Sequence, residues 1–235
     1  MTNKEFLVKV KDSFDKYLET GSRSNEKLKI LHGAIAQDLK NRLGNNYQVH
    51  SLGYGDDREV NMSGRYMDKK VDIAVEKNGE ILSAIALKFI MRNYSQNSNN
   101  YFENMLGETA NIRSAGKPYF QIVIMPSKVP YFKKGGELDH IETITEHNLS
   151  KYLKLSNDNI EEYMHTPTKT LIYLVDIPDI SLFNIKNEDD YVFYYTENSD
   201  FVVMENSVPY GFGNSVIYNN YNEFIDKVSH YIQSI

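Results

Sequence analysis

Patterns of apolar residues predict helices in three parts of the chain, at 3–19, 24–43 and 221–235. Residues three and four positions apart fall on one side of a helix, so each segment would have one buried face. Ser24 or Asn25 can cap the second helix at its start. The chain is therefore expected to begin and end with helices.

Short apolar runs between these helices predict strands. The segment 47–53 predicts one strand, and 71–89 predicts a β-hairpin around a Lys-Asn-Gly sequence. Nearly continuous apolar runs at 118–126 and 170–177 predict strands that are buried on both faces. The pattern at 189–207 predicts a second hairpin.

The remaining segments predict loops and further helices. The loops are at 55–70, 92–99 and 127–136, and the helices are at 99–114, 139–153 and 158–164. The order over the first half is then helix, three strands, helix and strand, which indicates an α/β chain with a central mixed sheet flanked by helices. We expect a single domain over 1–235, with a core at about 24–126 and a C-terminal elaboration at 127–235.

The composition narrows the class of protein. The 235 residues carry a net charge of −6 and no cysteine, which excludes disulfides and thiolate metal sites. The N-terminus lacks the apolar region of a signal peptide, and no stretch reaches the length of a membrane span. We expect a cytoplasmic bacterial protein with no membrane partner. The negative charge is a caution against a simple nucleic-acid binder, but clustered carboxylates at a metal site can account for it.

Three charged residues could supply the chemistry of phosphodiester hydrolysis. Asp72 lies in the first strand of the hairpin, Lys88 lies near the end of the second strand, and Glu103 lies on the helix that follows. Carboxylates are suitable ligands for Mg²⁺, which stabilises charge on a phosphate and activates water. A lysine can orient or deprotonate that water. We predict that Asp72 and Glu103 bind the metal and that Lys88 acts on the water.

The register of the hairpin sets a condition on this site. Side chains alternate between the faces of a strand, so a plain two-residue turn would put Asp72 and Lys88 on opposite faces. A three-residue loop with Gly79 in the left-handed conformation would pair Asp72 with Ala84 and restore a common face. We therefore predict an odd-length loop or a β-bulge.

The helix after the lysine strand offers two candidates for the second acid. Glu103, Gly107 and Ala110 fall on one stripe, and its small residues would let the helix approach the sheet closely. Glu108 lies five positions after Glu103, well around the helix. Glu103 is the preferred acid, and Glu108 is the alternative.

These features resemble the PD-(D/E)XK nuclease superfamily, and specifically type II restriction endonucleases. The resemblance rests on Val71 and Asp72, on the Ala-Leu-Lys run that ends at Lys88, and on the segment 93–113. It covers about residues 24–126. It implies a restriction-endonuclease-like αβββαβ core, Mg²⁺ as cofactor, double-stranded DNA as substrate and a homodimer that cuts a short sequence.

The chain departs from the family pattern at two positions. Val71 stands in place of the proline, and Ala86 stands in place of the second acid. Either the acid has moved to the following helix, where Glu103 lies, or Ala86 replaces a glutamate in an inactivated variant. We favour the relocated acid. The rival functions are a related nuclease with another target, such as a junction resolvase or a repair nuclease, and a DNA-binding protein of this fold without catalysis.

Two polar segments near the proposed site could contact DNA, because amides, arginines and lysines bond base edges and phosphates. The candidates are Arg92, Asn93, Gln96, Asn97, Asn99 and Asn100 in the first segment, and Lys128, Tyr131, Lys133 and Lys134 in the second. The six histidines lack HxH or HExxH spacing, so we predict surface or core positions for them rather than zinc ligation. The acids of the 55–70 loop are interpreted as solvated charges.

Overall fold

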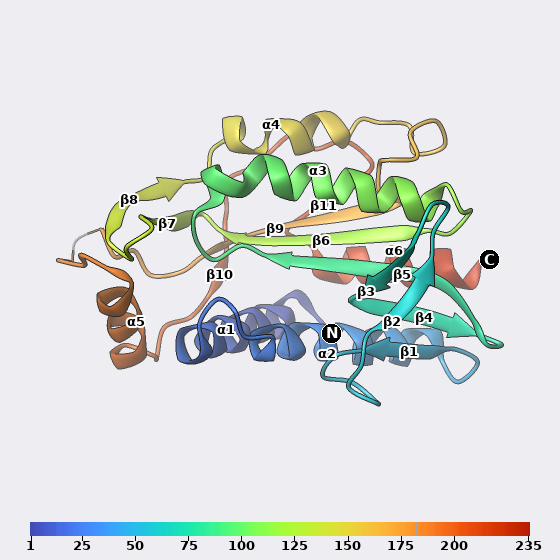
Figure 1. The fold of residues 1–235 in the computed structure, drawn as a ribbon, viewed down its shortest axis with the longest axis horizontal. Coiled ribbons are helices and arrows are strands. Elements are labelled where there is room, and N and C mark those ends of the chain that lie inside the picture. Colours follow the sequence, from blue (N-terminus) through green and yellow to red (C-terminus); the bar gives the residue numbers. More distant parts are fainter. Residues whose placement is uncertain (182) are drawn as a thin grey trace.

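The computed structural model describes residues 1–181 and 183–235. Within these ranges six helices accompany a central sheet of seven strands with parallel and antiparallel pairs, so the predicted α/β class is confirmed. Figure 1 shows α3 (Tyr94–Arg113) and α4 (Glu146–Leu155) on one face of this sheet, and α1 (Asn3–Thr20), α2 (Glu26–Leu43) and α6 (Tyr221–Gln233) on the other. Helix α5 (Glu188–Glu197) lies beyond one end of the sheet.

The strands of the central sheet follow a spatial order that differs from their order in the chain. This order is β1 (Gln48–Ser51), β4 (Ile73–Lys77), β5 (Glu80–Phe89), β6 (Tyr119–Pro126), β9 (Lys169–Asp176) and β10 (Met204–Glu205), and β11 (Val216–Tyr218) pairs with the start of β9. Strands β5, β6 and β9 are parallel, and β1, β4 and β5 are antiparallel. Two small sheets pair β2 (Val60–Ser63) with β3 (Asp68–Val71), and β7 (Lys128–Phe132) with β8 (Leu138–Thr143).

The alternation of side chains along β5 decides what each face of the sheet contacts. Ile85 and Leu87 belong to the larger core, which lies against α1, α2 and α6. Ala84 and Ala86 belong to a smaller cluster on the side of α3. By the same alternation Lys88 lies on the α3 face, where its side chain is exposed.

Local sequence explains where α1 begins and where both α1 and α2 end. Thr2 and Glu5 form a capping box, in which the backbone N–H of Glu5 donates to the Thr2 hydroxyl and that of Thr2 donates to the Glu5 carboxylate. Gly21 and Gly44 follow α1 and α2 with φ of 77° and 79°, a conformation that favours glycine. These local signals are independent of the rest of the fold.

Most elements predicted from periodicity are confirmed. They are the helices at 3–19, 24–43 and 221–235, the strands at 47–53, 118–126 and 170–177, and the hairpin at 71–89. Each has a helical repeat, a long apolar run or a turn sequence that is legible without tertiary contacts.

The predicted loop at 55–70 is wrong, because this segment contains the β2–β3 hairpin. The segment is mostly polar, and Met62 is its one fully buried side chain, so no apolar alternation marks the strands. The turn is held from outside by Asn111 of α3, whose side-chain oxygen accepts the N–H of Tyr66 at 2.9 Å and whose amide donates to the carbonyl of Met67 at 2.8 Å. Local patterns do not reveal bonds of this kind.

Several predictions in other segments are also wrong. The loop at 92–99 is mostly the start of α3, and the loop at 127–136 contains β7. The helix predicted at 139–153 begins as β8 before α4 forms, and 158–164 makes turns instead of a helix.

The hairpin predicted at 189–207 is wrong because most of its first half forms α5. The side chain of Asn187 accepts the N–H of Asp190 at 2.8 Å and caps this helix. Tyr191 and Tyr195 lie one turn apart and are both buried, so the tyrosine-rich sequence suits a helix as well as a strand.

None of the helices in the described residues combines the length and the apolar character that crossing a membrane requires.

Candidate active site

Asp72 and Lys88 lie on the same face of the sheet because β5 contains a bulge. The strands β4 and β5 meet in a two-residue Asn-Gly turn, and Leu82 is an extra residue that shifts the register. Beyond the bulge, Ala74 pairs with Ala84. The predicted bulge is confirmed, whereas the three-residue loop and the pairing of Asp72 with Ala84 are wrong.

Asp72 lies at the bend between β3 and β4, one residue before the strand in which it was predicted. Its carboxylate Oδ2 accepts the backbone N–H of Leu87 at 2.7 Å, and its carbonyl accepts the hydroxyl of Ser51 at 2.9 Å. These bonds fix the carboxylate against the neighbouring strand β5.

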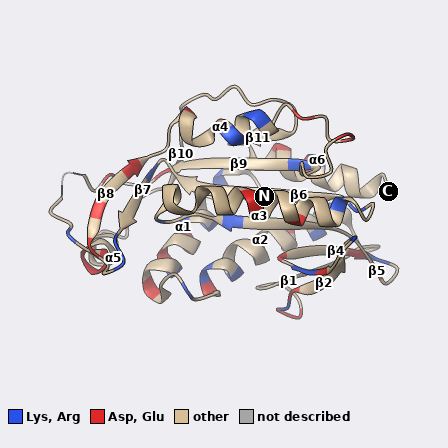
Figure 2. Cartoon of the chain, turned by 45° about the horizontal axis from the view of Figure 1, so that its top comes forward, with Lys and Arg blue, Asp and Glu red and all other residues tan. Residues whose placement is uncertain are grey.

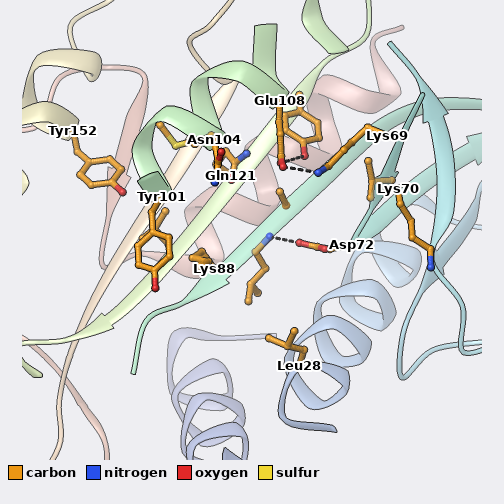
Figure 3. A pocket seen from close by; sticks show the side chains of 16 residues that line it. Leu28, Lys69, Lys70, Asp72, Lys88, Tyr101, Asn104, Glu108, Gln121 and Tyr152 are labelled. Atoms are coloured by element: carbon orange, nitrogen blue, oxygen red, sulfur yellow. Dashed lines mark hydrogen bonds and ion pairs between the residues drawn. The ribbon is translucent and has the colours of Figure 1, made fainter. Parts of the chain in front are cut away.

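A pocket of about 320 Å³ opens between α3 and the sheet, and Figure 3 shows the side chains that line it. Asp72, Lys88 and Glu108 bring charged groups to this pocket from the β3–β4 bend, β5 and α3, and Lys69 and Lys70 of β3 also line it. A water molecule in the liquid occupies about 30 Å³. The pocket is therefore large enough for a hydrated cation and a phosphate group.

Helix α3 presents Glu108 to the pocket, not Glu103. Glu103 is exposed and is not among the residues that line the pocket. At Gly107, on the same stripe as Glu103, an added Cβ would meet nothing within 4 Å. The stripe therefore faces solvent and not the sheet, which removes the basis for Glu103 as the second acid.

Two neighbours hold the carboxylate of Glu108. It forms an ion pair with the ammonium group of Lys69 at 2.5 Å, and the hydroxyl of Tyr119 lies 3.4 Å from Oε2. Burial raises the pKa of Tyr119 well above its usual value, and the charges of Glu108 and Asp72 raise it further. Tyr119 therefore remains a neutral hydrogen-bond donor beside the two acids.

The surroundings of Asp72 oppose the ionised form of its carboxyl group. Burial raises the pKa of its carboxyl, while the N–H of Leu87 lowers it. The charge of Glu108 also raises this pKa, and Lys69 and Lys88 lower it. A cation would stabilise the ionised form that burial and the second acid disfavour. Carboxylate oxygens are the donors that Mg²⁺ prefers, so the residues present fit this ion.

Lys88 lies at the opening of the pocket. Its ammonium group is 4.4 Å from the centre of the Tyr101 ring. Lys88 also lines an adjoining groove, together with Lys27 and Arg92. A molecule that entered the pocket along this groove would therefore pass close to the lysine.

Two of the DNA-contact candidates in the segment after β5, Arg92 and Asn93, instead bind other parts of the chain. Asn93, at a φ of 50°, accepts the backbone N–H of Phe132 at 3.0 Å and donates to its carbonyl at 2.7 Å, which joins the start of α3 to β7. Arg92 forms an ion pair with Glu188. The other candidates on this segment are Gln96, Asn99 and Asn100, which are exposed, and Asn97, which is half-buried.

Most of the candidates in the basic segment have partners among the described residues. The pairs are Lys128 with Asp179, Lys133 with Asp139 and with Glu137, and Tyr131 stacked on His140, while Lys134 is exposed. Figure 2 shows Lys and Arg dispersed over many elements, with acidic positions on β8 beside this segment. Its positive charge is therefore partly neutralised.

A second cluster next to Asp72 was not predicted from the sequence. One ligand atom from each of His32, Glu59 and Asp72 lies within 4.8 Å of the other two. His32 is 1% exposed, and neither ring nitrogen has a hydrogen-bond partner in the described ranges. Its position four residues after Leu28 in α2 signals an inward-facing side chain, but its neighbours come from a separate loop that spacing does not reveal.

Comparison with known proteins adds no family assignment, because no family model, no curated protein and no solved structure matches the chain.

Proposed function

We propose that the chain is a Mg²⁺-dependent endonuclease of the restriction type, which hydrolyses phosphodiester bonds in double-stranded DNA. The observation that carries this proposal is the convergence of Asp72, Lys88 and Glu108 on one pocket from three separate elements. Two acids and a lysine are the groups that metal-assisted phosphodiester hydrolysis needs. The resemblance of the sequence motifs to the PD-(D/E)XK nucleases points to the same chemistry.

Each of the three groups has a defined role in this proposal. Asp72 and Glu108 would bind the cation, which supplies charge stabilisation at the phosphate and activates water. The N–H of Leu87 and the ammonium group of Lys69 orient these two carboxylates before substrate arrives. Lys88 would hold the attacking water and stabilise negative charge next to it. The water oxygen attacks phosphorus, and the bond to the leaving oxygen breaks.

The proposal includes a homodimer that acts on a short and often palindromic sequence. Two-fold symmetry in a protein matches two-fold symmetry in its DNA site, so each copy would cut one strand. Cleavage at fixed positions separates this function from that of a repair nuclease or a junction resolvase.

The direct test is digestion of a long mapped DNA with Mg²⁺, followed by sequencing of the fragment ends. We expect discrete fragments from the wild-type protein and a rate at least about 100-fold lower for Asp72→Asn and Lys88→Met, because each removes a group from the reaction. Lys227→Met serves as the control, since Lys227 is exposed on α6 across the sheet from α3. Intact DNA after incubation with the wild-type protein, or wild-type cleavage by both variants, would overturn the proposal.

A second candidate function rests on Ala86. This residue lines the pocket at the position where the resembling family has an acid, so a chain without that acid could bind DNA without cutting it. The substitution Ala86→Glu would add a carboxylate near Asp72. Cleavage by the substituted protein alone would assign the natural chain to DNA binding, whereas cleavage by both would support the acid on α3.

A further inference from the structure

We propose that His32, Glu59 and Asp72 form a binding site for a divalent first-row transition cation, with Mn²⁺ as its probe. This inference goes beyond the proposed nuclease activity, because it concerns a ligand set that contains nitrogen and can be tested by binding alone. Asp72 is shared with the pocket, while His32 and Glu59 lie outside the set of residues that line it.

The spacing of the three side chains suits a single ion. Three ligand atoms about 2.1 Å from one ion lie about 3.4 Å from one another in a tetrahedral site. One ligand atom from each of the three residues already lies within 4.8 Å of the others. A cation would therefore need to shorten each of these separations by at most about 1.5 Å.

The burial of His32 without a hydrogen-bond partner among the described residues is the observation that points to a ligand. Its ring is buried, and both nitrogens lack a hydrogen-bond partner in the part of the chain that the structure describes. Buried polar groups are normally satisfied, because an unpaired one loses its bonds to water without replacement. A cation bound to one ring nitrogen would provide the missing interaction at the position where two carboxylates also converge.

Close backbone packing holds the two halves of the cluster together. A Cβ on Gly53 would lie 2.1 Å from the carbonyl oxygen of Lys29, so only glycine permits this contact between α2 and the loop after β1. Lys29 also forms an ion pair with Asp57 of the same loop at 3.0 Å. The loop that leads to Glu59 is thereby fixed against the helix that carries His32.

The donor set indicates the class of cation. One imidazole and two carboxylates combine a nitrogen ligand with oxygen ligands, a set that favours transition metals over Mg²⁺, which prefers oxygen alone. Lys70 is the ion-pair partner of Glu59, at 3.6 Å, and its side chain is largely exposed. A cation bound directly to the carboxylates of Glu59 and Asp72 would neutralise their charge from a shorter distance than Lys70 does.

The experiment is a titration of the purified, metal-free protein with Mn²⁺, followed by electron paramagnetic resonance and by calorimetry, with Mg²⁺ titrated in parallel. We expect a site that binds Mn²⁺ at least about tenfold more tightly than Mg²⁺, since imidazole is a poor ligand for Mg²⁺. His32→Leu and Glu59→Gln should each weaken Mn²⁺ binding at least about tenfold, as expected when one of three protein ligands is lost. Asp56→Asn, an exposed acid in the same loop, should leave it unchanged.

Thermal unfolding without metal checks that the variants fold, and Glu59→Gln provides a partly buried position outside the hydrophobic core. Wild-type Mn²⁺ affinity in a folded His32→Leu protein, or in Glu59→Gln, would overturn the inference. Loss of Mn²⁺ affinity in both variants would support it, whether or not the wild-type protein cleaves DNA. Failure of the nuclease proposal is thus distinguishable from failure of this one.

Discussion

Asp72 contributes to two groups of side chains because it lies at the junction between β3 and β4. On the side of α3 it shares a pocket with Lys88 and Glu108. On the side of α2 it approaches His32 and Glu59. Substitution of Asp72 would therefore affect both proposed sites, whereas substitution of any one of the other four residues tests a single site.

His32 should make the stability of the metal-free protein depend on pH. Burial lowers the pKa of this imidazole to about 4, from the ordinary value of 6.5. Between these two pH values His32 is protonated in the unfolded chain but neutral in the folded chain. Its contribution to the free energy of unfolding is therefore fully present above pH 6.5 and is lost as the pH falls toward 4. At about pH 5 the expected loss is about 2 kcal/mol, at 1.36 kcal/mol per pH unit.

Urea unfolding in the presence of a chelator, at neutral pH and at about pH 5, measures this contribution. His32→Leu places an apolar side chain of similar size at this buried position and should remove most of the difference between the two conditions. The same loss of stability in both proteins would contradict a neutral buried imidazole.

At the level of single residues, the sequence could predict the positions of Asp72 and Lys88 but not that of Glu108. Strand alternation and the need for a bulge were sufficient to place the first two residues on a common face, although Asp72 lies at a bend and not in the strand. The acid on α3 depends on how that helix is rotated about its axis, which is set by packing of Met105 and Ile112. A stripe of small residues suggested the opposite rotation, because small side chains suit close packing and solvent exposure equally.

Among the elements, α3 does more than supply an acid to the pocket. Asn111 near its end holds the turn of the β2–β3 hairpin, and Glu108 pairs with Lys69 of β3. A Cβ on Gly64 of this turn would lie 2.1 Å from the Asn111 amide nitrogen. The hairpin and the helix therefore approach each other at a point where any larger residue would have to displace the Asn111 side chain.

Two alanine substitutions of glycine should have opposite effects on stability. Gly64→Ala should destabilise the protein by about 1–3 kcal/mol, because the added methyl group displaces Asn111 and its bonds to the turn. Gly107→Ala on the exposed side of α3 should stabilise it by about 0.5–1 kcal/mol, because alanine is the better helix former. Denaturant unfolding of both variants measures the pair. A neutral Gly64→Ala would contradict the tight contact.

The elements that the sequence did not predict are those that depend on distant partners. The β2–β3 hairpin is polar and relies on Asn111. Helix α5 is tyrosine-rich, and its Tyr195 packs against both Phe14 of α1 and Tyr191. The confirmed helices and strands carry their own periodic or apolar signal. An element is therefore predictable from the sequence when local interactions supply most of its stability, and is missed when distant contacts supply it.

Across the whole molecule, the fold brings residues of α2, β3, β5, α3 and β6 together around one pocket. The two crossovers around α3 and α4 cover one face of the sheet, and α1, α2 and α6 cover the other (Figure 1). The pocket lies where α3 passes over β5, close to the start of α2 at Leu28. The net charge of −6 is compatible with this arrangement because a cation at the pocket would locally reverse the potential that a phosphate meets.

The most direct measurement of the central claim compares DNA cleavage by two variants of the same helix, Glu108→Gln and Glu103→Gln. Both remove one negative charge from α3, but only the first removes a carboxylate from the pocket. With Mg²⁺, we expect the rate to fall at least about 100-fold for Glu108→Gln and to stay within about threefold of wild type for Glu103→Gln. The reverse order, or equal rates in the two variants, would contradict the assignment of the pocket as the active site.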